Sequence, residues 1–169
     1  YQDSIRPETP AIFFDVQGFE SLADFSLTPN ITGVTSWSDR RRLFNWIRRA
    51  MPDVRDIYSV TGVGLIDKET TFEVERLEEF TSENFTFHDW SIYSLEEIQD
   101  KAASIPHHGL IYYQLLFEDA GGKKHIPLKA LEEIVASSSV PVVSSFDQFI
   151  GTGTIGGFMF SIEEVAAKS

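Results

Sequence analysis

The hydrophobic positions of this chain alternate between short continuous apolar runs and longer stretches with one apolar face. Runs typical of buried strands predict strands at 11–16, 31–34, 56–61, 85–92, 109–117, 140–144 and 157–161. Between them, apolar residues recur with helical spacing and predict helices at about 38–51, 67–80, from Ser94 to the residue before Pro106, and 127–137, with a short helical piece at 146–150. Strand and helix in alternation, with short links, predict an α/β fold whose parallel sheet is covered by helices on both faces.

Local signals place the starts of the predicted helices. Ser94 and Glu97 have the spacing of a capping box, in which each side chain bonds the backbone N–H of the other residue. Ser36 and Asp39 have the same spacing ahead of the helix at about 38, and Pro127 occupies a favoured first helical position. Asp67 is expected to cap the helix that it begins.

Composition narrows the classes of function. The formal charge is −12 with a pI near 4.6, which argues against binding to a phosphate backbone, so we expect no nucleic-acid partner. There is no cysteine, which excludes disulfides, thiol nucleophiles and cysteine-ligated metals. The 42% hydrophobic content is that of a packed globular protein, and no apolar run approaches the ~20 residues of a membrane span.

Candidate binding residues follow from the strand ends. In open parallel sheets, ligands bind beyond the carboxyl ends of the strands, which here are the turns after Val16, Thr61, Phe117 and Ser144. A few polar groups among aromatic side chains are typical of a small-molecule cleft. The candidate ligand-binding residues are therefore Asp15, Gln17, Gly62, Gln114, Phe117, Ser144, Phe146 and Asp147. Neither a cofactor nor a metal site is expected.

The stretch GTGTIGG at 151–157 contains the letters of a dinucleotide-binding turn, G-x-G-x-x-G. Such a turn needs a strand before it, a helix after it and an acidic residue about 20 positions further on. Here a short helical piece precedes the glycines and a predicted strand follows, so no nucleotide is expected. Gly151, Gly153, Gly156 and Gly157 are instead interpreted as a tight turn or as a hinge between two lobes.

Three other features have a functional and a structural interpretation. Six of the eight arginines lie at 40–42, 48, 49 and 55, and could form an anion-binding or partner patch; the helical spacing favours a solvated outer face. His107 and His108 follow a proline in a loop and are expected to face solvent rather than hold a metal. Ser144, Ser145 and Asp147, with the histidines, supply the residue types of a hydrolase triad, although no G-x-S-x-G elbow is present.

Several segments together resemble a known family. The runs PAIFFDVQGF at 10–19 and PNITGV at 29–34 resemble a junction found in ABC-transporter-type substrate-binding proteins. The apolar strand at 109–117 with Asp119 and Gly122 in its turn is similar to the family's apolar strand followed by D-x-x-G. The ending SSVPVVS, Phe146-Asp147 and GTGTIGG is similar to the family's closing motif.

The resemblance implies a fold like that of type I periplasmic binding proteins, with two α/β lobes around a ligand cleft. It implies a fragment: residues 1–35 as a remnant of the first lobe and crossover, 36–150 as an α/β lobe, and 151–169 as a return crossover strand and tail. It implies an extracytoplasmic, periplasmic sensor domain of a bacterial histidine kinase or diguanylate cyclase, part of two-component or related signal transduction, or a related transporter protein. We therefore expect a small-molecule ligand, no catalysis, membrane attachment through the parent chain, and a homodimer. The alternative is a small α/β hydrolase that uses Ser and Asp at strand ends.

Overall fold

The computed structural model describes residues 9–17, 28–36, 40–71, 74–79, 85–157 and 159. The chain divides into two compact units, Tyr1–Ser38 with Phe160–Ser169, and Asp39–Met159. The predicted boundaries at 35/36 and 150/151 compare with unit boundaries at 38/39 and 159/160, so the glycine stretch belongs to the larger unit. Each unit is described by itself below.

The larger unit is built on a parallel sheet of four strands in the order β4-β3-β5-β6. The strands are β3 (Asp56–Thr61), β4 (Thr86–Asp89), β5 (Gly109–Leu115) and β6 (Val142–Ser144), and every pairing between them is parallel. All residues of β5 are buried, because this central strand is covered on both faces. The predicted α/β class with a parallel sheet is therefore confirmed.

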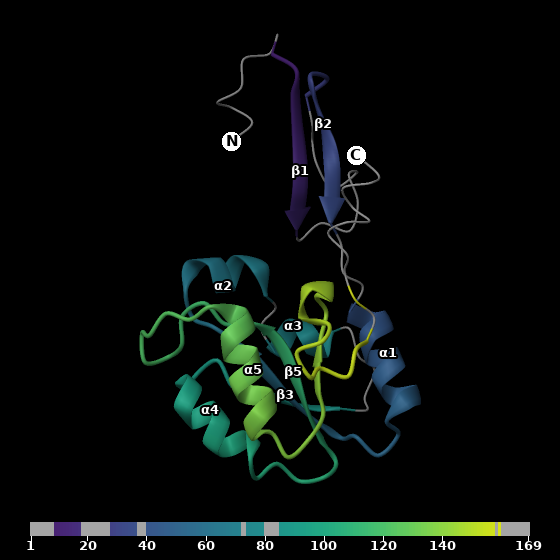
Figure 1. The fold of residues 1–169 in the computed structure, drawn as a ribbon. Helices are drawn as coiled ribbons and strands as arrows, with labels where there is room; N and C mark the ends of the chain where they lie inside the picture. Colours follow the sequence, from purple (N-terminus) through teal and green to yellow (C-terminus); the bar gives the residue numbers. More distant parts are fainter. Residues whose placement is uncertain are drawn as a thin grey trace. The chain divides into compact units, whose positions relative to one another are not determined.

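Helices cover both faces of this sheet (Figure 1). On one face, α1 (Arg40–Ala50) and α3 (Val74–Glu78) pack in a core that includes Leu43, Ile47, Leu77, Ile57 and Tyr112. In Figure 1, α4 (Leu95–Ala102) and α5 (Pro127–Ser137) lie in front of the strands, against the opposite face. Alternate residues of each strand face the two layers, which is the period of two expected of a strand.

Local sequence signals position α4 and α5 as predicted. Ser94 accepts a hydrogen bond from the backbone N–H of Glu97, at 3.3 Å, and the Glu97 carboxylate accepts one from the backbone N–H of Ser94, at 2.8 Å. Pro127 is the first residue of α5, where the missing N–H costs nothing. A 3-10 helix, η3 (Asp147–Phe149), occupies the short helical piece expected before the glycines.

Two details of this unit differ from the expectation. The helix predicted at 67–80 is two short helices, α2 (Leu65–Thr70) and α3, because Thr71 is extended and ends the first. The apolar runs at 56–61, 109–117 and 140–144 predict central, buried strands, but among the described strands β6 lies at an edge of the sheet, although its residues are buried.

The arginines were expected outside, and most are. Arg41, Arg42, Arg48, Arg49 and Arg55 are exposed. Arg40, however, is only 5% exposed and belongs to the interior, so the expectation is wrong for this residue. The first turn of α1 lies against the core, and the long stem of arginine can pack there as an apolar group.

The smaller unit contains β1 (Ala11–Gln17) paired in parallel with β2 (Ile31–Ser36). The register shifts between Phe14 and Val16, so Asp15 lies at an irregularity in the ladder. Both strands were expected, with slightly shorter bounds. Of the strand predicted at 157–161, only Gly157 and Met159 are described, and neither is in a strand. The other residues of that prediction, and the capping pair Ser36 and Asp39, lie outside the described residues or side chains.

Candidate ligand-binding site

The connections of the sheet separate at the carboxyl ends of β3 and β5. The chain leaves β3 through α2 and α3, and α3 packs on the same face as α1. It reaches β5 and then β6 through α4 and α5, on the other face. The two sets of connections diverge between these neighbouring strands, and this divergence point is where open α/β sheets bind ligands.

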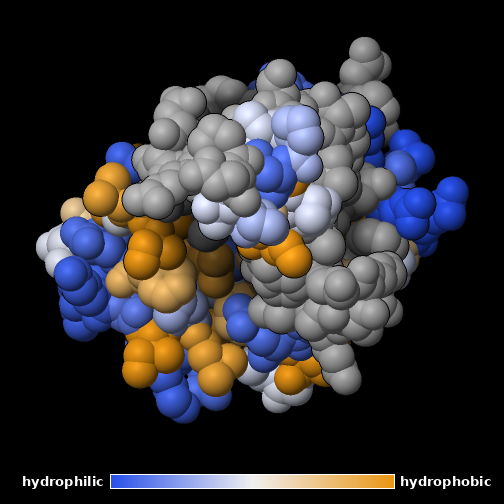
Figure 2. Space-filling model, turned by 90° about the horizontal axis from the view of Figure 1, so that it is seen from above, coloured by the Kyte–Doolittle hydropathy of each residue, from blue (hydrophilic) through white to orange (hydrophobic). Residues whose placement is uncertain are grey.

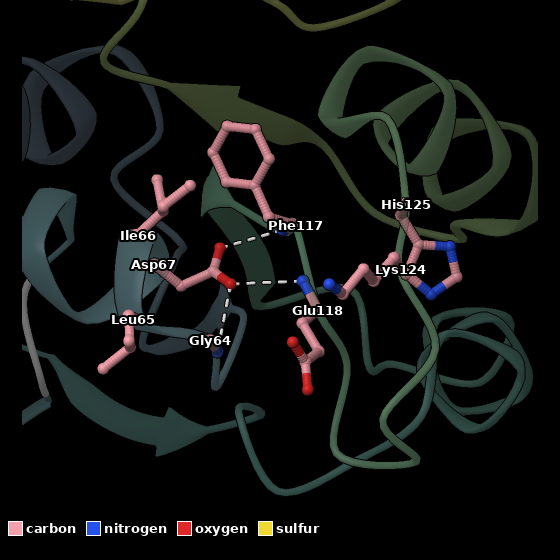
Figure 3. Close-up of a pocket in the computed structure, with 8 residues that line it drawn as sticks. All are labelled: Gly64, Leu65, Ile66, Asp67, Phe117, Glu118, Lys124 and His125. Atoms are coloured by element: carbon pink, nitrogen blue, oxygen red, sulfur yellow. Dashed lines mark hydrogen bonds between the residues drawn. The ribbon is translucent and has the colours of Figure 1, made fainter.

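Asp67 ties the two diverging segments together. Its buried carboxylate accepts hydrogen bonds from the backbone N–H groups of Phe117 at 2.8 Å, Glu118 at 3.1 Å and Gly64 at 3.2 Å (Figure 3). Asp67 does contribute to the cap of α2, but as its third residue and not at its start: Gly64 is the N-cap, and the Asp67 carboxylate accepts from its backbone N–H. The same carboxylate also bonds a segment 50 residues away, which was not expected. Burial and then the negative charge of Asp67 raise the pKa of Tyr113, in β5, far above its ordinary value.

Gly62 leaves room for this carboxylate. A Cβ atom on Gly62 would lie 2.3 Å from Oδ2 of Asp67, which is closer than real Cβ contacts come. The backbone N–H of Gly62 donates to the Leu115 carbonyl at 2.9 Å, and that of Val63 donates to the Glu118 carbonyl at 2.8 Å. The loop after β3 is thus joined to the end of β5 by backbone as well as by the aspartate.

A hollow of about 410 Å³, called the first hollow, opens beside this junction. Figure 3 shows the eight residues that line it, with α2 on one side and the chain after β5 on the other. The lining residues are Gly64, Leu65, Ile66, Asp67, Phe117, Glu118, Lys124 and His125. Its wall is mainly apolar, with few polar groups, which is the usual make-up of a small-molecule site.

A second hollow of about 310 Å³ adjoins the first, because Phe117 lines both. Its other lining residues come from the end of β5, the start of α5 and η3: Leu115, Ile126, Pro127, Leu128, Gln148 and Phe149. Phe117 is therefore the residue that the two linings share.

Large aliphatic side chains are exposed at the same end of the sheet. Leu65 is 82% exposed, Ile66 is 55%, and Ile126 and Ile150 are each 67%. Figure 2, seen from the end where α2 lies, shows hydrophobic side chains gathered on the larger unit. Clustered exposed apolar groups, unlike scattered ones, mark interaction sites.

The turn after β5 is held by a second buried aspartate. The Asp119 carboxylate accepts hydrogen bonds from the Leu95 backbone N–H at 3.1 Å, the Lys123 backbone N–H at 3.0 Å and the His125 ring at 2.8 Å. Burial acts to raise the pKa of Asp119, but the hydrogen bonds from His125 and the two backbone groups outweigh it and lower the pKa. Asp119 therefore orients His125 and the chain that borders the first hollow.

The structure brings two of the candidate binding residues to this junction. Phe117 lines both hollows, and Gly62 lies under Asp67. Gln114 is buried inside the sheet, where its amide donates to the Ser59 hydroxyl at 3.1 Å, so it satisfies a neighbour in the core.

The candidates at the end of β6 and just after it are not lining residues, although they adjoin Gln148 and Phe149 of the second hollow. The Ser144 hydroxyl is buried and accepts from the Phe146 N–H at 3.4 Å, while the Phe146 ring packs edge-on against Phe149. Asp147 is half-buried at the start of η3. Asp15 and Gln17 belong to the smaller unit, and their side chains are not among those described.

The four glycines at 151–157 all have positive φ, between 87° and 151°. The turn is fastened to the larger unit: the Ile155 N–H donates to the Val142 carbonyl at 3.0 Å, and the Phe149 carbonyl accepts from the hydroxyls of Thr152 and Thr154. No helix follows within 151–157, as expected for a chain reversal rather than a dinucleotide turn. The role of these glycines as a hinge stays a prediction.

The remaining polar candidates have structural partners. Asp56 contacts His88 at 2.7 Å and His108 at 3.0 Å at the amino end of the sheet, whereas His107 is exposed as expected. His108 was expected to face solvent, but its contact with Asp56 leaves it only partly exposed. Within the described residues, no three His, Asp or Glu side chains are arranged to hold a metal ion.

The sequence matches no family model, and comparisons with curated proteins and with solved structures find no similar protein. In the part of the chain that the structure describes, no helix is long and apolar enough to cross a membrane. The fold and the divergence point therefore define the class: an α/β protein with an open, mainly apolar hollow at the carboxyl end of its parallel sheet.

Sequence analysis missed most of the lining of the first hollow. Leu65, Ile66, Glu118 and Lys124 line it but were not among the candidate residues. The rule that ligands bind beyond the carboxyl ends of parallel strands did point to the segments after Thr61 and Phe117, which supply this lining. The rule locates the segments but does not say which side chains of each segment turn into the hollow.

Proposed function

We propose that this chain is a small-molecule-binding module of a signalling or transport protein, with no catalysis of its own. The observation that carries the proposal is the first hollow, which opens at the divergence of the connections beyond β3 and β5. Its apolar wall and few polar groups suit a bound organic molecule. The resemblance to extracytoplasmic sensor domains, and a location outside the cytoplasmic membrane, agree with a binding role and belong to the same proposal.

Hydrogen bonding supports binding over hydrolysis. The hydrolase alternative needs a serine hydroxyl bonded to a histidine that is oriented by a carboxylate. Ser145 Oγ is instead 2.7 Å from the Tyr112 hydroxyl, and Ser144 Oγ accepts from a backbone N–H. The His125–Asp119 pair fastens a turn. Among the hydrogen bonds of the described residues, none joins a serine to a histidine, so no observation favours the alternative.

The test is a ligand screen by thermal unfolding with matched variants. A ligand that binds the folded state raises the midpoint temperature in proportion to the logarithm of its concentration. Leu65→Gln changes an 82% exposed wall residue, so it should alter ligand binding with little effect on the fold. His107→Ala is the control, because this exposed residue lies in the loop before β5, at the opposite end of the sheet.

We expect at least one compound to raise the midpoint of the wild type and of His107→Ala, and to raise that of Leu65→Gln less. Stabilisation that is equal in all three proteins would place the ligand elsewhere and reject the first hollow as the site. A broad library without any stabilising compound would count against a binding module altogether.

The homodimer expected from the sequence is part of the same proposal and is tested separately. Ile12 in β1 is 81% exposed, and a two-stranded sheet is marginal alone in water. Sedimentation velocity should show a dimer that Ile12→Lys weakens, since the unpaired backbone at a sheet edge is a template for pairing and a lysine there opposes it. A monomer at all concentrations tested would remove the dimer from the proposal.

A further inference from the structure

The backbone donors at the divergence point are already used by the protein. Anions bind to groups of backbone N–H at such loops, as phosphates do in nucleotide-binding proteins. Here the N–H groups of Gly64, Phe117 and Glu118 all donate to the carboxylate of Asp67. Asp67 thus occupies the position that an anionic ligand would take, and these donors are not available to one.

The charged side chains that line the first hollow leave it negative. Glu118 is half-buried, and in the described part of the chain no hydrogen bond or ion pair engages its carboxylate. Lys124 is the one cationic lysine or arginine among the eight lining residues, and it is exposed. Asp67 in the wall and Asp119 behind His125 add further carboxylates. With a net charge of −12 on the chain, the electrostatic potential favours a cation.

Phe117 adds a surface for both parts of such a ligand. An ammonium group over an aromatic face is attracted by the ring quadrupole, and Phe117 borders the hollow that Glu118 also lines. Phe117 also lines the second hollow, together with Leu115, Ile126 and Leu128. An apolar chain that extends past Phe117 into the second hollow would therefore bury apolar surface against these side chains.

We infer that the ligand of this site is an organic amine, with its ammonium group beside Glu118 and its apolar body extending past Phe117 into the second hollow. This inference rests on the proposed function and names the ligand class of the same site. It requires a charged head and an apolar body in one molecule, because charged side chains line the first hollow, none lines the second, and the two linings share Phe117.

The experiment compares three series of probes of equal length: straight-chain amines, alcohols and carboxylates from four to eight carbons. Binding to the full chain is measured by calorimetric titration at low ionic strength. We expect amines to bind about fivefold more tightly than the alcohols, and carboxylates to bind most weakly. Within the amine series, each added methylene should tighten binding about fourfold until the second hollow is filled.

A matched pair of variants isolates the charge. Glu118→Gln should weaken the amines about fivefold and leave the alcohols unchanged, whereas Lys124→Gln should strengthen the amines. Both substitutions neutralise one lining residue with a side chain of similar size, so each serves as the control for the other.

A second pair isolates the apolar body. Ile126→Ser, at a 67% exposed residue of the second hollow, should flatten the dependence on chain length. Ile92→Ser is the control, since Ile92 is 64% exposed and is not part of either lining.

The outcomes separate the inference from the proposed function. If the carboxylates bind best, or if alcohols bind as tightly as amines and Leu65→Gln abolishes both, the site binds small molecules but the amine inference is wrong. If the amines bind but Glu118→Gln has no effect, the assigned position of the ammonium group is wrong and the inference fails. If no amine binds, the inference also fails, and the library screen alone then decides whether the chain is a binding module.

Discussion

Replacement of Asp67 by asparagine tests the junction on which the site depends. The substitution keeps the size and shape of the side chain but replaces one carboxylate oxygen with an NH₂ group. Oδ2 accepts from Gly64 and Glu118, and Oδ1 accepts from Phe117 at 2.8 Å. If the amide oxygen keeps the two bonds of Oδ2, the NH₂ group must face the Phe117 N–H, and two donors then oppose each other in the interior.

The expected cost follows from these contacts. Loss of a hydrogen bond to a charged, buried acceptor costs about 1.5–3 kcal/mol, which includes the unsatisfied donor. The two retained bonds lose their charge assistance, which is roughly half of their strength. We therefore expect Asp67→Asn to lower the free energy of unfolding by about 2–4 kcal/mol, a large share of the ~5–15 kcal/mol that holds a domain folded.

Urea unfolding followed by far-UV circular dichroism measures the change in midpoint at constant slope. Amide hydrogen exchange at Phe117 and Glu118 reports directly on the junction, because protection there depends on these bonds. Asp100→Asn is the matched control: this exposed aspartate lies on α4, and its replacement should change stability by no more than ~0.5 kcal/mol. If Asp67→Asn cost as little as the control, the carboxylate would not be holding the two segments together.

Three further predictions concern neighbouring features. Gly62→Ala should destabilise the protein by about 1–3 kcal/mol in the same urea assay, because its Cβ would overlap the Asp67 carboxylate; a neutral result would contradict the close packing. The pKa of Asp119 in the folded state lies below its ordinary value of 3.8, so at acidic pH the unfolded state binds more protons than the folded state. The free energy of unfolding should therefore fall as the pH drops below about 4. Asp119→Asn should flatten this part of a stability-against-pH curve, and an unchanged curve would refute the assignment. Gly151→Ala and Gly153→Ala both place an alanine at positive φ, which costs about 1–2 kcal/mol. Only the Cβ of Gly153→Ala also meets a valine side chain, at 2.6 Å, so the midpoint temperature of this variant should fall further. Equal losses in the two variants would contradict the contact with valine.

Sequence periodicity was sufficient to predict most elements of the larger unit. The strand predicted at 56–61 has these bounds, and the α5 helix runs from Pro127 to Ser137 as expected. The capping box of Ser94 and Glu97 is formed as its spacing indicated. These features depend on contacts within one or two turns of the chain or on which face of an element is apolar, and the local sequence contains that information.

The site required the tertiary structure. Asp67 was expected only to cap a helix; it bonds the Gly64 N–H at the start of α2, but its two other backbone partners, Phe117 and Glu118, lie 50 and 51 residues away. Gln114 was expected to bind a ligand, but its partner Ser59, 55 residues distant, places it in the core.

The strand-end rule identified the two segments that border the first hollow, yet the lining was decided by packing. Leu65 and Ile66 remain exposed while Asp67, next to them, is buried, because a carboxylate with three backbone donors is stable in the interior, where its hydrogen bonds replace those to water. The chain pattern determines where strands end and which segments follow them. The direction in which each side chain of those segments turns depends on hydrogen-bond partners that come together only when the sheet is assembled.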